Sequence, residues 1–128
     1  MCHVTVASTW EIFPDDLGPA IDFYTRVLGF DIIRDCRADP DPYAALRRGD
    51  AVIGLSPRSL TGDRRHRRPP VGVELGIEVD DLDAAYARVR TEGWRVEEPI
   101  TQRPWGVRDF RILDPDAYYL CIREHEYL

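Results

Sequence analysis

The sequence predicts an α+β fold made of two consecutive β-α-β-β-β modules. Within each half, the apolar residues first alternate, then recur at a helical period, and then alternate again. The chain also repeats itself: Asp-Leu-Gly-Pro-Ala at 16–20 and Gly29 correspond to Asp-Leu-Asp-Ala-Ala at 81–85 and Gly93, with offsets of 81 − 16 = 65 and 93 − 29 = 64 residues. A repeat of this length indicates two copies of one structural unit, and we expect the function where the copies meet.

The first module is expected to begin with a short strand that leads into a helix. Asp15 or Asp16 is the predicted N-cap, Pro19 lies in the first turn, and Gly29 ends the helix. The helix carries an apolar stripe that is typical of core packing and not of a cofactor site, namely Phe23, Tyr24, Val27 and Leu28. Two later strands are predicted at 43–46 and at 51–55.

The second module follows the same plan. Alternation predicts a strand over 73–79, with one face toward a helix and an open face on the other side. Asp80 or Asp81 is expected to cap the helix, Gly93 to end it, and its apolar positions are Leu82, Ala85, Tyr86 and Val89. Strands at 110–113 and 118–123 are predicted on either side of a turn at 114–117.

Length and composition point to one domain over residues 1–128, with module 1 at about 1–60, a linker at about 61–70 and module 2 at about 71–128. No apolar run approaches the ~20 residues of a membrane span, and the first residues lack a signal-peptide pattern. We therefore expect a cytoplasmic protein without a membrane partner. Cys2, Cys36 and Cys121 have no metal-like spacing and are predicted to be free thiols.

The net charge of −6 argues against nucleic acid as the main partner and favours a cationic ligand. One segment has the opposite sign, because the run Arg-Arg-His-Arg-Arg at 64–68 precedes two prolines. A solvated linker is the favoured interpretation of this run, and an anion or nucleic-acid patch is the alternative.

Taken together, the duplicated modules, the Phe-Tyr-x-x-Val-Leu-Gly-Phe helix end at 23–30 and the Asp-Pro-Asp turn at 114–116 resemble the vicinal oxygen chelate superfamily. That superfamily includes glyoxalase I, extradiol dioxygenases, fosfomycin-modifying enzymes and bleomycin resistance proteins. The resemblance implies two tandem βαβββ modules that form a curved mixed sheet with an open cleft and helices on the outer face.

The resemblance also identifies four positions that hold a metal ion in metal-binding members. Here these positions carry Thr9, Gly54, Glu74 and Cys121, which do not supply converging ligands of the usual kind. We therefore expect no metal and no cofactor. His3 and His125 are interpreted as terminal or surface histidines.

The segment Arg-Pro-Trp-Gly-Val-Arg-Asp-Phe at 103–110 is similar to the bleomycin resistance proteins. This likeness implies a symmetric homodimer that sequesters a bulky cationic or aromatic ligand without changing it chemically. Ala117 departs from the glycine usual at that turn, so the turn must avoid or tolerate a positive φ.

Strand alternation selects the side chains expected to line the cleft. Leu120 and Ile122 are assigned to the core, which leaves Tyr119, Cys121 and Arg123 on the open side, and Trp10 and Ile12 are assigned to the core of the first module. With the loop tryptophan, the predicted ligand-binding residues are Thr9, Glu11, Glu74, Trp105, Tyr119 and Cys121. No catalytic residue is assigned.

Each of these assignments has a structural alternative. Glu74 is otherwise a solvated strand residue, Trp105 a loop anchor and Cys121 an inert apolar group, while Arg108 and Asp109 pair with each other.

Two other functions compete with sequestration. One is a glyoxalase-like lyase or isomerase, or a dioxygenase-type enzyme, with a degenerate metal site or with Glu74 as general base and Tyr119 as acid. The other is a regulatory or partner-binding domain that takes no small ligand.

Overall fold

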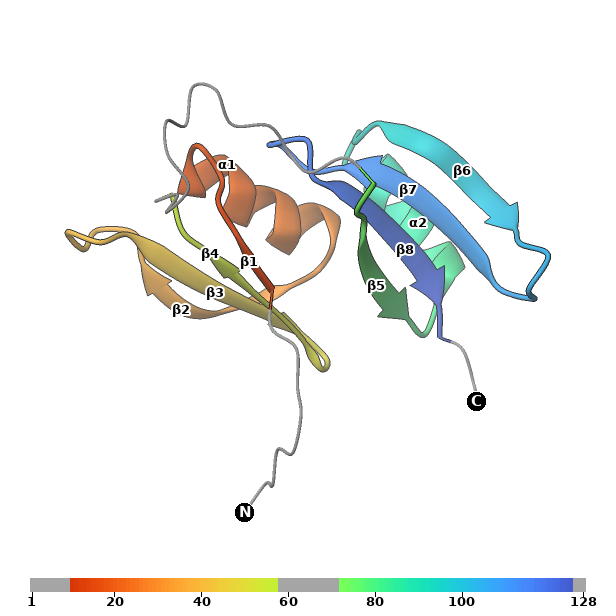
Figure 1. The fold of residues 1–128 in the computed structure, drawn as a ribbon, viewed down its shortest axis with the longest axis horizontal. Helices are drawn as coiled ribbons and strands as arrows, with labels where there is room; N and C mark the ends of the chain where they lie inside the picture. Colours follow the sequence, from red (N-terminus) through yellow and green to blue (C-terminus); the bar gives the residue numbers. More distant parts are fainter. Residues whose placement is uncertain (1–9, 58–71, 126–128) are drawn as a thin grey trace, which may run out of the picture.

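The computed structural model describes residues 10–57 and 72–125. The first range contains the strands β1 (Trp10–Ile12), β2 (Asp31–Cys36), β3 (Tyr43–Arg48) and β4 (Ala51–Leu55). The second contains β5 (Leu75–Val79), β6 (Val96–Gln102), β7 (Arg108–Leu113) and β8 (Tyr119–Glu124). They form two four-stranded sheets with the orders β1-β4-β3-β2 and β5-β8-β7-β6 (Figure 1).

The two sheets have the same topology. In sheet 1 the strands β1 and β4 are parallel and the remaining pairs are antiparallel, and β5 and β8 form the corresponding parallel pair of sheet 2. The predicted α+β class and the two βαβββ modules are thus confirmed. One detail differs from the expectation, since hydrogen bonding produces two separate sheets and not one continuous curved sheet.

In the first module the helix starts where the sequence predicts. The side chain of Asp16 accepts a hydrogen bond from the backbone N–H of Gly18 and caps α1 (Leu17–Asp22). The helix then widens into a π-helical segment, η1 (Phe23–Val27), which the periodicity did not predict. It ends at Gly29, whose φ of 76° is easily adopted only by glycine.

In the second module α2 (Leu82–Thr91) begins at Asp81, whose carboxylate accepts from the backbone N–H of Ala84. The turn between β7 and β8 contains Ala117 with a φ of 64°, so this turn tolerates the positive φ that its missing glycine would accommodate better. Around it, Asp114 accepts hydrogen bonds from the backbone N–H groups of Asp116 and Tyr118, which hold the turn in place.

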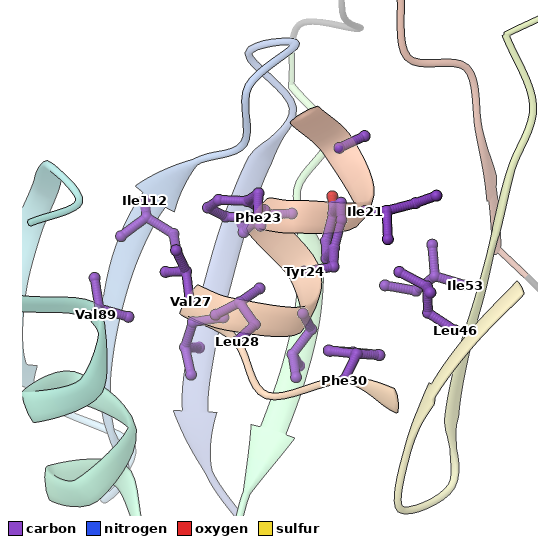
Figure 2. Packing of buried hydrophobic residues seen from close by; sticks show 14 of the residues in the cluster. Ile21, Phe23, Tyr24, Val27, Leu28, Phe30, Leu46, Ile53, Val89 and Ile112 are labelled. Atoms are coloured by element: carbon purple, nitrogen blue, oxygen red, sulfur yellow. The ribbon is translucent and has the colours of Figure 1, made fainter. Parts of the chain in front are cut away.

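The α1–η1 helix lies between the two modules and packs against both (Figure 2). Ile21 and Tyr24 point toward Leu46 and Ile53 of sheet 1, whereas Phe23 and Val27 point toward Ile112 and Val89 of the second module. The buried apolar residues of both modules therefore form a single cluster. Because each sheet turns its helix side toward this shared core, the opposite sides face away from it, and we call these two sides the open faces.

Polar contacts fix the two modules to each other. The buried hydroxyl of Tyr24 donates a hydrogen bond of 2.7 Å to Asp114, and burial together with this carboxylate raises the pKa of Tyr24 well above its ordinary value. Arg88 of α2 donates to the backbone carbonyls of Thr25 and Arg26 at the end of η1. The rings of Phe23 and Trp94 lie 4.6 Å apart between centroids.

Within residues 10–57 and 72–125, no helix combines the length and the apolar character that crossing a membrane requires. Four parts of the chain for which the sequence led to a prediction lie outside the described residues, namely Cys2, His3, Thr9 and the arginine-rich linker.

The Tyr24–Asp114 contact leads to a stability prediction. We expect Tyr24→Phe to lower the free energy of unfolding by about 1.5–3 kcal/mol, because it removes the hydroxyl that donates to Oδ2 of the buried Asp114 carboxyl. Urea denaturation measures this change. Tyr43→Phe is the matched control, since the structure shows no hydrogen bond of that hydroxyl to any described residue, and we expect it to shift stability by less than about 0.5 kcal/mol. Equal stability of the two variants would contradict the assigned role.

Candidate functional site

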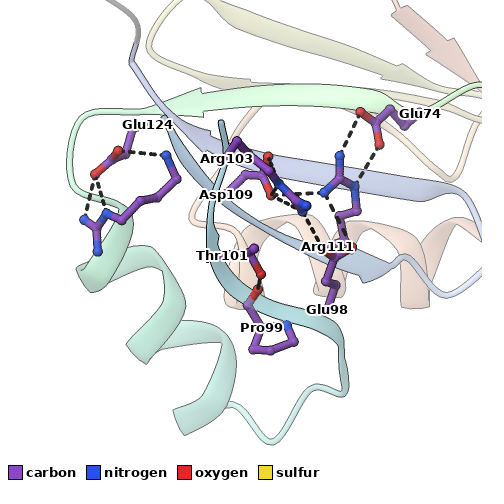
Figure 3. A network of polar contacts seen from close by, with 9 residues as sticks. Glu74, Glu98, Pro99, Thr101, Arg103, Asp109, Arg111 and Glu124 are labelled. Carbon is purple, nitrogen blue, oxygen red and sulfur yellow. Dashed lines mark hydrogen bonds and ion pairs between the residues drawn. The ribbon is translucent and has the colours of Figure 1, made fainter. Parts of the chain in front are cut away.

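A cluster of paired charges covers the open face of sheet 2 (Figure 3). Arg103 lies 2.5 Å from Glu98 and 2.7 Å from Asp109. Arg111 lies 3.0 Å from both Glu74 and Asp109, and 3.6 Å from Glu98. We call these five residues the charged cluster. The strand register explains their proximity, because Arg111 of β7 lies opposite Glu98 of β6.

The centre of the charged cluster is shielded from solvent. The side chain of Asp109 is only 5% exposed. Burial alone would raise the pKa of Asp109, but the guanidinium groups of Arg103 and Arg111 outweigh it and lower that pKa. The hydrogen bond to Glu74 raises the pKa of Arg111. Each of these acids is therefore already paired with a cation of the same chain.

Cys121 lies at the centre of this face, opposite Arg111 on one side and Gly76 on the other. Its side chain points to the open side, as alternation predicts, but the residue is only 2% exposed. Burial raises the pKa of the thiol, so it stays protonated at neutral pH and is a poor nucleophile. The geometry gives Cys121 no direct access to a ligand.

The two predicted aromatic residues lie at opposite ends of sheet 2. Tyr119 is 36% exposed and begins β8, whereas Trp105 is 66% exposed and lies in the turn between β6 and β7. That turn precedes Arg108, and Tyr119 is paired with Leu113 at the far end of β7. At ~3.3 Å per residue, the two ends of β7 are about 17 Å apart. The structure therefore does not bring Trp105 and Tyr119 together.

Two structural alternatives for the β6–β7 hairpin are wrong. A tryptophan that anchors a loop is buried, but Trp105 projects into solvent from a tight turn closed by a hydrogen bond from Gly106 to Arg103. Arg108 does not pair with Asp109, because their side chains point to opposite sides of the strand. Arg108 instead binds Glu124 at 2.6 Å and Asp83 at 3.1 Å.

The open face of sheet 1 carries a smaller polar group. Glu11 lies opposite Gly54 in the parallel β1–β4 pair. A Cβ placed on Gly54 would meet Glu11 Oε2 and the hydroxyl of Tyr43, each at 2.8 Å, so both groups converge above this glycine. Burial, and after it the charge of Glu11, raises the pKa of Tyr43. The sequence analysis missed Tyr43, although strand alternation from Ala44 would have placed it on this face.

A hollow of about 660 Å³ separates the edges of the two sheets. It is bordered by Trp10 and Val52 of sheet 1 and by Gly76 and Glu78 of β5. Its volume lies in the range of small-molecule sites. Since Gly76 and Glu78 also belong to the open face of sheet 2, the hollow continues that face at its edge.

The predicted site residues thus fall into separate groups. Glu74 and Cys121 both lie next to Arg111. Tyr119 is near enough for the charges of Arg111 and Glu74 to act on its pKa. Trp105 is at the far end of the sheet, and Glu11 is on the other module. Thr9 lies outside the described residues.

The residues present do not fit a metal ion of the kind found in metal-binding vicinal oxygen chelate proteins. Glu74 is occupied by Arg111, Cys121 is a buried protonated thiol and Gly54 offers no side chain. Among the residues that the structure describes, no group of three or more His, Cys, Asp and Glu is arranged to hold an ion. The positive charge between the acids of this face is the guanidinium group of Arg111.

We expect the protein to retain no stoichiometric Mn²⁺, Fe²⁺, Ni²⁺ or Zn²⁺ after equilibrium dialysis, as measured by elemental analysis. Arg111→Met is the informative comparison, because it frees the carboxylate of Glu74 and leaves Glu98 and Asp109 with Arg103 as their remaining cation. This variant should bind divalent ions more tightly than the wild type. One tightly held ion per wild-type chain would contradict this prediction and would show that the chain supplies enough ligands for a metal ion.

Comparison with known proteins agrees with this architecture. The sequence matches the model of the Glyoxalase/Bleomycin resistance protein/Dioxygenase superfamily over residues 3–122. No curated protein sequence matches the chain.

Similar folds occur in an antibiotic-binding protein, a bleomycin resistance determinant and an enzyme. TnmS3, an antibiotic-binding protein from Streptomyces sp. CB03234, is 24% identical, with 97% of this chain and 100% of that chain covered and a TM-score of 0.74. The bleomycin resistance determinant encoded on transposon Tn5 is 22% identical, with 96% and 100% covered and a TM-score of 0.72. Lactoylglutathione lyase from Agrobacterium tumefaciens is 21% identical, with 94% of each chain covered and a TM-score of 0.70.

These identities establish a shared fold and not a shared activity. The family model covers nearly the whole sequence, and the two βαβββ modules agree with it. The chain belongs to the Glyoxalase/Bleomycin resistance protein/Dioxygenase superfamily.

Proposed function

We propose that this protein binds a bulky aromatic, antibiotic-like molecule on its open faces and releases it chemically unchanged. The observation that carries this proposal is the charged cluster. Glu74, the candidate general base, is held by Arg111 at 3.0 Å. Cys121 is buried with a raised pKa, so neither residue is prepared for chemistry. Antibiotic binding by the similarly folded TnmS3 agrees with this function.

Exposed aromatic groups support the aromatic character of the ligand. Trp105 and Tyr119 offer ring surface at the two ends of the open face of sheet 2. A large ligand that reaches either ring can stack on it and exclude water from that contact. Val52, which lies opposite Arg47 and alternates with the buried Ile53, adds exposed apolar surface on the open face of sheet 1.

The expected cationic character of the ligand has weaker support. It rested on the net charge of −6, but the acids of sheet 2 are paired with arginines of the same chain. On sheet 1, Glu11 is exposed and can meet a ligand cation. A ligand amine would therefore bind at sheet 1.

The same part of sheet 1 favours one alternative function. Glu11 and Tyr43 converge over Gly54 as a carboxylate beside a hydroxyl, which is an arrangement used for proton transfer. In a lyase or isomerase, Glu11 would serve as the base and Tyr43 as the acid. The raised pKa of Tyr43 makes it a weak acid, which is why binding is preferred.

A second copy of the chain would complete the ligand cleft. The two open faces of one chain point away from the shared core, so they do not enclose a ligand between them. In a twofold dimer, the open face of sheet 1 in one chain can lie opposite that of sheet 2 in the other, which gives two equal clefts. We therefore propose a homodimer in which each cleft is built from both chains.

The ligand prediction is tested with bleomycin and a series of fused-ring aromatic antibiotics, by isothermal titration calorimetry. We expect saturable binding that Trp105→Ala weakens about fivefold to tenfold, because one stacking contact is lost. Trp105→Tyr, which retains an aromatic ring, should lose much less.

Mass spectrometry of the recovered ligand tests whether any chemistry occurs. Recovery of unaltered ligand is expected. A converted product that disappears with Glu11→Gln would replace sequestration by the enzyme alternative.

The dimer is tested by sedimentation velocity over a range of protein concentrations. We expect a species of twice the mass of one chain, and one bound ligand per chain in the titrations, since two equal clefts form from two chains. A monomer that binds ligand with the same stoichiometry would contradict the shared cleft.

A further inference from the structure

On the open face of sheet 2, Arg123 is a cation without an ion-pair partner among the described residues. It lies on β8 between Glu78 of β5 and Asp109 of β7, and strand alternation directs its side chain to the open side. Its Nε is buried and has no hydrogen-bond partner, and its guanidinium forms no ion pair with any residue in 10–57 or 72–125. A buried donor without an acceptor is rare in folded proteins and calls for an explanation.

The acids next to Arg123 are occupied by other residues. Asp109 accepts from Arg103 at 2.7 Å and from Arg111 at 3.0 Å. Glu78 lies 3.0 Å from the Nδ1 atom of His125. The two acids opposite Arg123 on the neighbouring strands are thus bound by other side chains, and within the described residues Arg123 has no ion pair with either of them.

Gly76 provides the space in which the Arg123 side chain lies. The guanidinium crosses directly over this residue, where a Cβ would come into contact with Nη2 and would lie 3.0 Å from Cζ. Any side chain at position 76 would displace the guanidinium. Gly76 also borders the hollow between the sheets, so the unpaired cation lies at the rim of a space large enough for a small molecule.

We propose that Arg123 binds the carboxylate of an aromatic ligand, in a pocket formed over Gly76 at the edge of sheet 2. The inference rests on the proposed ligand-binding function and specifies its ligand class. A guanidinium matches a carboxylate with two parallel hydrogen bonds and also stacks on aromatic rings, so one residue serves both parts of such a ligand. Attraction to this local cation opposes the repulsion between an anion and a chain of net charge −6.

The test uses benzoate, 2-naphthoate and anthracene-2-carboxylate, each paired with its own carboxamide, in calorimetric titrations. For the wild type, we expect the acids that bind to do so about tenfold or more tightly than their amides. The carboxylate offers the guanidinium a charged acceptor with two oxygens, whereas the amide offers one neutral oxygen. Arg123→Gln should abolish this preference and leave the amide affinity nearly unchanged. Arg26→Gln, which removes an equal charge on the helix side, should keep it.

Gly76→Ala provides a second route to the same result. It retains Arg123 but fills the space beneath it, and we expect the acid preference to fall as it does in Arg123→Gln. Direct contact is read from the ¹⁵N–¹H signal of the Arg123 side chain, which should shift with 2-naphthoate and not with 2-naphthamide. A residue that only supports the fold would show no such difference between acid and amide.

The outcomes separate this inference from the function on which it rests. Equal binding of acids and amides by the wild type would overturn the carboxylate assignment and leave aromatic binding intact. An acid preference that survives in both Arg123→Gln and Gly76→Ala would place the carboxylate elsewhere and would also overturn it. Failure of every acid and every amide to bind folded wild-type protein would contradict both the inference and the proposed function.

Discussion

The packing of one helix against two sheets determines where the functional surfaces of this molecule lie. The α1–η1 helix buries Ile21 and Tyr24 against sheet 1, and Phe23 and Val27 against the second module (Figure 2). Burial of large apolar side chains on both sides of one helix contributes on the order of 2 kcal/mol for each residue. Both sheets therefore direct their helix sides inward, and their polar sides form the outer surface. The hydrogen bond from Tyr24 to Asp114 and the contacts of Arg88 then fix the modules relative to each other.

The outer surface of sheet 2 carries acidic side chains that would attract cations if they had no partners in the chain. Three carboxylates are paired with two arginines in the charged cluster, and removal of one buried partner would leave an uncompensated charge. Arg111 contacts all three acids, so it occupies the central position that a cation would otherwise take. Arg123 differs because the acids next to it are already paired. In sheet 2, the paired charges of the cluster hold their side chains in place, whereas the guanidinium of Arg123 is the group proposed to bind a ligand.

Much of the fold follows from local signals in the sequence. Asp16 and Asp81 cap the helices, and Gly29 ends the first because only glycine readily adopts its φ. Strand alternation correctly predicted that Leu120 and Ile122 are buried in the core. The π-helical segment was not predictable in this way, since it depends on packing from both sides of the helix. The two separate sheets likewise depend on how the modules dock, and apolar periodicity does not specify that docking.

The candidate site was less predictable for a related reason. Alternation shows on which face a side chain lies, but it does not show which partner it finds there. The pairing of Arg103 with Glu98 and Asp109 depends on the β6–β7 register and its irregularities. Arg108 and Asp109 are adjacent in sequence yet belong to different networks on opposite sides of the strand. Cys121 points to the predicted side but is covered by its neighbours.

The parallel strand pair of each module contains one glycine on its open side, but on different strands. Gly54 is on the last strand of module 1, opposite Glu11, whereas Gly76 is on the first strand of module 2, opposite Cys121. A carboxylate and a hydroxyl lie over the first glycine, and a guanidinium lies over the second. Each module thus has one position without a side chain, and groups of opposite charge lie over the two positions, although neither position is the repeat of the other. Each can acquire new chemistry by substitution of a single neighbouring side chain while the shared core stays intact, so selectivity in this protein can evolve one half at a time.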